Sequence, residues 1–131
     1  PITGETAREG MEQPVIHWTP SIAVCGIDFY EGDRFPKWTG HLFVTALAQQ
    51  ELRRLVIEDG RVTHQEVLLK DISRLRDVGS GPDGLLYVVM NDPGRVIRLV
   101  PVQRLIGAPA GAGIFRGTNT AAGTRGARIL P

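Results

Sequence analysis

The sequence has a single cysteine, almost no net charge and no long apolar run, and each shortage excludes a class of protein. Cys25 has no second cysteine to pair with, so no internal disulfide can form. Fifteen basic residues balance fourteen acidic ones, and a net charge of +1 gives no basis for a nucleic-acid partner. No apolar run approaches the length of about 18 residues that a transmembrane helix needs, so we expect no membrane partner.

The patterns that carry common catalytic and metal-binding chemistry are also missing. There is no Ser-His-Asp arrangement, and the Gly-Pro-Asp-Gly segment at residues 81–84 is not followed by a helix, as a phosphate-binding loop would be. His17, His41 and His64 have no cysteine or histidine partner at metal-ligand spacing. We therefore expect no catalytic residue and no metal ligand in this chain, and we expect Cys25 to be a small buried hydrophobic residue.

Glycine and proline are abundant, and their positions indicate an all-β protein. At 131 residues the chain has the length of one domain, and its sixteen glycines and nine prolines separate short runs of strand-forming residues. Asp59-Gly60 is the strongest hairpin signal. Gly26, inside the first expected strand, suggests a bulge or a close backbone approach. The expected strands are residues 22–30, 40–47, 51–58, 61–69, 74–79, 84–90 and 95–100.

The sequence also contains an internal repeat with an offset of 44 residues. A repeat of about 40–45 residues made of short strands is the period of a four-stranded propeller blade, although chance similarity between hairpins is an alternative. The repeat predicts a β-propeller fragment of two antiparallel blades. One blade covers residues 22–70, and a partial last blade covers residues 73–103. The repeat, aligned without a gap, matches Gly40, Leu42, Val44, Arg54, Leu55 and Val56 with Gly84, Leu86, Val88, Arg98, Leu99 and Val100, and Asp33 with Asp77.

The predicted last blade has only three strands. In a closed propeller the last blade is often completed by a strand from the other end of the chain, so we expect its fourth strand to come from outside this chain or from a neighbouring molecule. Residues 104–131 are rich in Gly, Ala and Arg and read as a flexible tail. A non-native or processed extension explains them as well as a functional basic arm does.

Arg74 and Arg76 are the clearest candidate binding residues. Residues i and i+2 of a strand point to the same side, so both guanidinium groups leave the backbone together while Leu75 points the other way. Pairing with Asp77 or Asp83 would make them ordinary surface residues. Both tryptophans, Trp18 and Trp38, are expected to anchor the core rather than to stack on a sugar.

Several motifs together resemble one family. They occupy residues 10–14 (Gly-Met-Glu-Gln-Pro), 18–23 (Trp-Thr-Pro-Ser-Ile-Ala), 29–40, 74–78 and 81–84. Over about residues 1–100 the chain resembles the C-terminal part of the soluble aldose sugar dehydrogenases. These proteins, also called the glucose/sorbosone dehydrogenases, depend on pyrroloquinoline quinone (PQQ).

The resemblance implies a fold, a reaction and a location. It implies a six-bladed β-propeller in which this chain supplies little more than the last two blades. The parent enzyme would oxidise sugar C1 to a lactone with PQQ, calcium and a histidine base, and the base and the calcium ligands would lie in blades that this chain lacks. The parent would be periplasmic or secreted, although no signal peptide is visible. The chain starts without an initiator methionine, so we expect it to be part of a longer protein.

The resemblance also assigns cofactor-binding residues. Arg74 and Arg76 match the family's arginine pair, which holds the carboxylates of PQQ, and arginine binds carboxylates in a bidentate manner. Ser21 is a weaker match at a position near the cofactor. Ala48 stands where the family commonly has a lysine, which removes a cofactor contact.

Three functions therefore remain open at the level of sequence. The first is part of a PQQ-dependent sugar dehydrogenase that is inactive by itself. The second is a non-catalytic propeller-type binding or structural module, which Ala48 favours. The third is a calcium-dependent lactonase, for which residues 91–92 (Asn-Asp) are the only nearby candidates. The expected partners are a sugar substrate in the parent enzyme and either the remaining blades or a second copy that pairs with the open strand edges.

Overall fold

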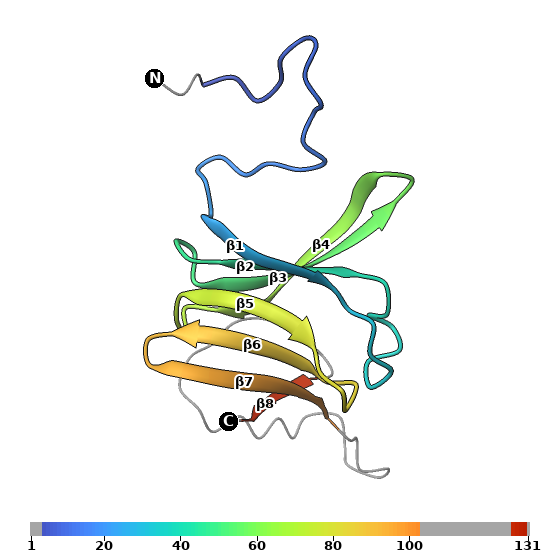
Figure 1. Cartoon of the computed structure of the whole chain (residues 1–131), viewed down its shortest axis with the longest axis vertical. Helices are drawn as coiled ribbons and strands as arrows, with labels where there is room; N and C mark the ends of the chain where they lie inside the picture. Colours follow the sequence, from blue (N-terminus) through green and yellow to red (C-terminus); the bar gives the residue numbers. More distant parts are fainter. Residues whose placement is uncertain (1–3, 103–126, 131) are drawn as a thin grey trace, which may run out of the picture.

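Two four-stranded antiparallel sheets make up the described part of the chain (Figure 1). The computed structural model describes residues 4–102 and 127–130, and no helix occurs among them. The first sheet has the order β1 (Val24–Phe29), β2 (Leu42–Ala46), β3 (Glu51–Glu58) and β4 (Arg61–Lys70). The second has the order β5 (Leu75–Ser80), β6 (Leu86–Asn91), β7 (Gly94–Pro101) and β8 (Ala127–Leu130). The predicted all-β class is confirmed, and β1 to β7 match the seven predicted strands to within two residues at each end.

The fourth strand of the second sheet comes from this chain itself, which differs from the expectation. β8 pairs antiparallel with β7, with Ala127 opposite Pro101, and it takes the outer position that β4 takes in the first sheet. The physical reason is that the outer edge of β7 has free backbone groups that any extended segment can satisfy. The predicted tail at 104–131 thus includes a strand at 127–130, and residues 103–126 and 131 lie outside the described residues.

The hydrophobic core lies between the two sheets. The first sheet contributes Phe43 and Leu52, and the second contributes Leu86 and Val88, all of them fully buried. Trp38 covers the edge of this core and stacks on Phe35 with ring centroids 4.3 Å apart, as predicted. The two sheets therefore form one packed unit.

β1 and β5, the first strand of each sheet, lie side by side and run in the same direction (Figure 1). We call these two strands the inner strands. A methyl group on Gly26 would lie 2.7 Å from the Asp77 Cα, so only glycine allows this approach. Farther along the two strands, the Ser80 N–H donates to Asp28 Oδ2 over 3.3 Å. The pairing of β1 with β2 also shifts register between Val24 and Ile27. The close approach and the bulge expected at Gly26 are both confirmed.

The repeat offset of 44 residues holds for the middle strands, where β2 and β3 correspond to β6 and β7, but it does not hold for the inner strands β1 and β5. Leu42 pairs with Leu55 as Leu86 pairs with Leu99, which preserves the offset of 44 residues. Phe29 pairs with Leu42, whereas Ser80, which follows Phe29 by 51 residues, pairs with Leu86. The loop that precedes β2 is therefore seven residues longer than the turn that precedes β6. The predicted match of Asp33 with Asp77 is wrong, because Asp33 lies in that loop and Asp77 lies in β5.

Candidate functional site

The arginine pair lies at the start of β5. Arg74 directly precedes the strand and Arg76 is its second residue; both are exposed, whereas Leu75 between them is fully buried. Exposed residues on either side of a buried leucine agree with the predicted alternation, and the orientation of the two guanidinium groups toward one side of the backbone stays a prediction. β5 shifts its register between Leu75 and Asp77, and Arg76 is the extra residue of this bulge.

Asn91, the last residue of β6, organises this pair. Its backbone N–H donates to the Arg74 carbonyl over 2.9 Å, and its Oδ1 accepts from Arg76 Nε over 2.9 Å. The sequence reading treats Asn91 only as a metal-ligand candidate and misses this role. The missed signal is the register of β5 against β6, in which Leu75 lies opposite Met90 and Asn91 therefore comes opposite Arg74.

No carboxylate pairs with either arginine within the described residues. The aspartates considered as surface partners are engaged elsewhere: Asp83 Oδ2 lies 3.7 Å from Arg98 Nη1, and Asp77 Oδ1 accepts from the Val78 N–H over 2.9 Å. The described ion pairs involve Arg53, Arg54, Lys70 and Arg98. Two permanently charged donor groups thus remain available to an anionic ligand.

Ser21 and Ala48 lie at the same end of the inner strands as the arginines. Ser21 comes three residues before β1, and its Oγ accepts from the Ala23 N–H over 3.1 Å. The Ala48 N–H donates to the Ile22 carbonyl over 3.1 Å, so Ala48 lies beside the same segment. Because β1 and β5 are parallel neighbours, their N-terminal ends face the same side of the molecule. The exposed methyl group of Ala48 offers this end no charge.

These donors fit a ligand that carries several carboxylates, which PQQ does. Arg76 donates a hydrogen bond to Asn91, and Arg74 is exposed directly before the same strand. Guanidinium groups form charge-assisted, often bidentate, hydrogen bonds with carboxylates. The hydroxyl of Ser21 already accepts one local hydrogen bond, and its O–H remains a donor. The residues present therefore suit the carboxylate end of the cofactor.

The histidines do not form a site with one another. His17 and His64 are exposed, and His41 Nδ1 lies 2.7 Å from Arg54 Nη1. Burial lowers the pKa of His41, and the charges of Arg54 and His64 lower it further. In the part of the chain that the structure describes, no group of three or more His, Cys, Asp or Glu residues is placed to hold a metal ion, and no helix is long and apolar enough to cross a membrane.

Two sequence-based expectations about packing are wrong. Cys25 is exposed rather than buried, because it lies on β1, which is the open edge of the first sheet. Trp18 does not anchor the core between the sheets. Its ring centroid lies 5.4 Å from the Arg53 Cζ, and its Nε1 donates to Gln65 Oε1 over 3.3 Å. The segment before β1 thus packs on the outward face of the first sheet.

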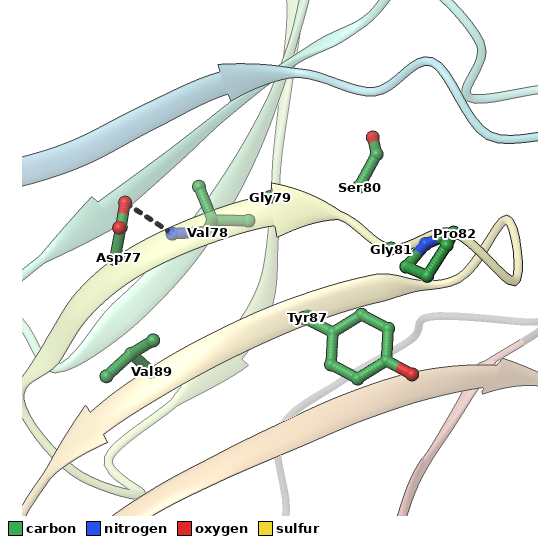
Figure 2. A pocket seen from close by; sticks show the side chains of 8 residues that line it. All are labelled: Asp77, Val78, Gly79, Ser80, Gly81, Pro82, Tyr87 and Val89. Carbon is green, nitrogen blue, oxygen red and sulfur yellow. Dashed lines mark hydrogen bonds between the residues drawn. The ribbon is translucent and has the colours of Figure 1, made fainter.

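Two hollows lie away from the arginine pair. One, of about 310 Å³, lies on the outward face of the second sheet between Gly79, Gly81, Tyr87 and Val89 (Figure 2). The other, of about 670 Å³, is polar and lies between residues 31–34 and 80–84 at the C-terminal ends of β1 and β5. Neither contains Ser21, Arg74 or Arg76.

Comparison with known proteins decides the family. The model of the family described as Glucose / Sorbosone dehydrogenase matches residues 1–98. The chain belongs to the glucose/sorbosone dehydrogenase family. It is 39% identical over 94 residues to the aldose sugar dehydrogenase YliI of Escherichia coli, covering 70% of this chain and 25% of that protein. It is 36% identical over 100 residues to an uncharacterized Synechocystis protein, covering 76% of this chain and 24% of that one.

A solved structure supports the same assignment. A crystal structure of a glucose dehydrogenase matches with a TM-score of 0.65 and 41% identity, covering 70% of this chain and 27% of that one. The structural neighbours are propeller-type glucose dehydrogenases, so the two sheets correspond to propeller blades and do not themselves close a ring. The chain spans about a quarter of the length of these family members.

Proposed function

We propose that this chain is the C-terminal part of a quinoprotein that oxidises aldose sugars to lactones. In this proposal Arg74 and Arg76 bind carboxylates of PQQ, and Ser21 donates a hydrogen bond at the same end of the inner strands. Bound PQQ would supply the two-electron acceptor for the oxidation. The catalytic base and the calcium ligands would lie in the remaining blades of an exported parent enzyme.

The carrying observation is the pair of exposed guanidinium groups that no described carboxylate neutralises. They flank the fully buried Leu75, and Asn91 Oδ1 accepts a hydrogen bond from one of them, at Arg76 Nε. Arg76 thus keeps its orientation before a ligand arrives, which lowers the entropic cost of binding. This arrangement would position a carboxylate-bearing cofactor without taking part in proton transfer.

Ala48 favours the alternative of a non-catalytic binding or structural module. An exposed alanine beside Ile22 leaves the proposed site with two cationic side chains where a lysine would have added a third. The two proposals differ in the affinity of the complete protein for PQQ. Micromolar or tighter binding supports the quinoprotein, whereas no binding supports the module.

The test is a PQQ titration of the complete protein in the presence of calcium. Each hydrogen bond to a charged group contributes about 1.5–3 kcal/mol, so Arg74→Ala and Arg76→Ala should each raise the Kd by about one to two orders of magnitude. Arg→Lys at either position should recover only part of the loss, because the bidentate geometry is absent. Arg61→Ala, at an exposed position in the β3–β4 hairpin, is the matched control. Unchanged PQQ affinity in both Ala variants would remove the role assigned to the pair.

A further inference from the structure

Glu51, the first residue of β3, is a buried charged side chain to which the proposed function gives no role. Among the residues that the structure describes, it is the one charged residue in the buried class, with no exposed surface at all. Burying a carboxylate costs free energy unless cationic groups and hydrogen bonds compensate for the lost water. The contacts of its two oxygen atoms therefore show which parts of the chain this carboxylate connects.

One oxygen connects Glu51 to the segment before β1. Glu51 Oε1 accepts from Arg53 Nε over 2.5 Å, two residues along the same strand. The Arg53 Cζ lies 5.4 Å from the Trp18 ring centroid, and Arg53 Nη1 and Trp18 Nε1 both donate to Gln65 Oε1, over 2.9 and 3.3 Å. Trp18 lies three residues before Ser21. The carboxylate thus orients the guanidinium group on which the segment that carries Ser21 packs.

The other oxygen faces the connection that leads to the arginine pair. Lys70, the last residue of β4, lies opposite Glu51 in the β3–β4 pairing. Its Nζ is 3.8 Å from Glu51 Oε2, and this oxygen accepts no hydrogen bond within the described residues. Residues 71–73 then lead from Lys70 to Arg74. The carboxylate therefore attracts the ammonium group of the residue directly before this connection.

The turn between β2 and β3, which ends at Glu51, joins the same two segments through the backbone. The Ala48 N–H donates to the Ile22 carbonyl over 3.1 Å. The Gln50 carbonyl accepts from the Asp71 N–H over 3.0 Å. The segment before β1 and the connection to β5 are thus both attached to this turn, and the buried carboxylate follows it directly.

We propose that Glu51 is a positioning residue for the cofactor site, an inference that rests on the proposed function. By fixing Arg53 on one side and Lys70 on the other, its charge sets the distance between Ser21 and the arginine pair. A ligand with several carboxylates binds tightly only where its donors are held at the matching separation. Glu51 is buried and does not touch the ligand, so removing its charge moves Ser21 without removing any donor.

PQQ titration of the complete protein in the presence of calcium measures this effect. A hydrogen bond from Ser21 to a carboxylate corresponds to about tenfold in Kd, so Ser21→Ala should raise the Kd by about that factor. Glu51→Gln keeps the shape of the side chain but turns an amide N–H₂ group toward Arg53 or Lys70, both of which are donors, and should raise the Kd about fivefold. The double variant should bind like Ser21→Ala alone, because both changes act through one hydroxyl.

Two further variants control for loss of charge and for misfolding. Glu66→Gln is the matched control, because Glu66 also pairs with an arginine of β3 and its hydrogen bonds in the described structure go to Arg54 alone. It should leave the PQQ affinity unchanged. Gln65→Ala, at an exposed position, removes the acceptor that the guanidinium and the indole share, and it should raise the Kd about twofold. It decides the question if Glu51→Gln does not fold.

Nuclear magnetic resonance of the indole N–H groups gives a readout that needs no ligand. In the unliganded 131-residue chain, Glu51→Gln should shift the Trp18 signal and speed its exchange with water. The signal of Trp38, which lies beside Arg54, should stay in place. Glu66→Gln should leave the Trp18 signal unchanged.

The outcomes separate this inference from the proposed function. If the wild-type protein binds PQQ and Glu51→Gln binds it equally well, Glu51 contributes to stability alone, and the inference is wrong while the proposed function stands. If the wild-type protein does not bind PQQ, both are overturned. A loss of affinity in Glu51→Gln that adds in full to that of Ser21→Ala, or an unchanged Trp18 signal, would also contradict the inference.

Discussion

His41 is a residue whose protonation makes the stability of the folded chain depend on pH. Its Nδ1 lies 2.7 Å from Arg54 Nη1, and Arg54 also donates to Glu66 Oε2 over 2.7 Å. Burial is the main cause that lowers the pKa of His41, the charges of Arg54 and His64 add to it, and Glu58 opposes it. The folded state therefore prefers a neutral imidazole that accepts the hydrogen bond from Arg54.

The lowered pKa makes the free energy of unfolding depend on pH. Above about pH 6.5, the ordinary pKa of histidine, His41 is neutral in both the folded and the unfolded chain, and its contribution to the free energy of unfolding is fully present. As the pH falls below that value the unfolded chain gains a proton first, so stability decreases until the folded pKa is passed. Urea unfolding from about pH 7.5 to about pH 5.5 should show this loss in the wild type and a smaller loss in His41→Gln. His17→Gln, at an exposed position, is the control; equal pH slopes in His41→Gln and the wild type would contradict the assignment.

At the scale of single residues, sequence alone predicted those whose environment follows from alternation within one strand. Arg74 and Arg76 are exposed and Leu75 between them is buried, as a period of two predicts, whereas the bulge at Arg76, which leaves Asp77 exposed as well, was not predictable. The environments of Cys25, Trp18 and Asn91 depend on which strand is inner, which face is covered and which residue is opposite. These are properties of pairing between distant segments, and local pattern does not contain them.

At the scale of elements, the loop between β1 and β2 joins the first sheet to the turn between β5 and β6. The fully buried Tyr30 donates its hydroxyl hydrogen to the Gly84 carbonyl, and its oxygen accepts from the Phe35 N–H over 3.1 Å. Burial raises the pKa of this phenol, so it remains a donor at neutral pH. The positive φ of Gly84, 75°, bends the turn so that its carbonyl meets the hydroxyl.

Removing this hydroxyl should weaken the connection between the sheets. Tyr30→Phe leaves a buried N–H and a carbonyl without their partner, and such groups cost about 1–3 kcal/mol of folding free energy. Tyr87→Phe removes an exposed hydrogen bond to Asp83 and should change stability by about 0.5 kcal/mol or less. Denaturant unfolding at low chain concentration measures both. A Tyr30→Phe variant as stable as Tyr87→Phe would show that the buried hydroxyl does not join the two sheets.

The elements themselves were predictable to different degrees. Seven strands followed from apolar runs and turn residues, and Asp59-Gly60 turns with positive φ at both residues, 50° and 71°, as a two-residue hairpin requires. β8 was not predictable, because a four-residue segment pairs through its backbone with an edge 26 residues earlier in the chain. The inner-strand offset was also missed, because an ungapped repeat cannot reveal that one connecting loop is seven residues longer than the other.

At the scale of the whole molecule, the chain spans about a quarter of the length of the relatives that it matches. A propeller blade is covered on both faces by its neighbours. Here one face of each sheet is covered by the other sheet, and the outward faces keep Phe29 and Val96 exposed. Arg74 and Arg76, at the N-terminal end of β5, are exposed among the described residues.

The 131-residue chain alone should therefore lack sugar dehydrogenase activity. Oxidation at a sugar carbon needs a group that accepts the hydroxyl proton, and a positioned base typically contributes about 10²- to 10⁴-fold to the rate. At the proposed site the described side chains are two guanidinium groups, an amide, a hydroxyl and a methyl, and none of them is a base at neutral pH. His41, the histidine with the lowered pKa, is engaged with Arg54 and lies in the loop that joins the opposite, C-terminal end of β1 to β2. A dye-coupled assay with added PQQ, calcium and glucose should stay at background, with the complete protein as the positive control. If the isolated chain turns over sugar and Arg74→Ala abolishes this turnover, the base lies within these residues. That result would refute the proposal that the base lies in the remaining blades.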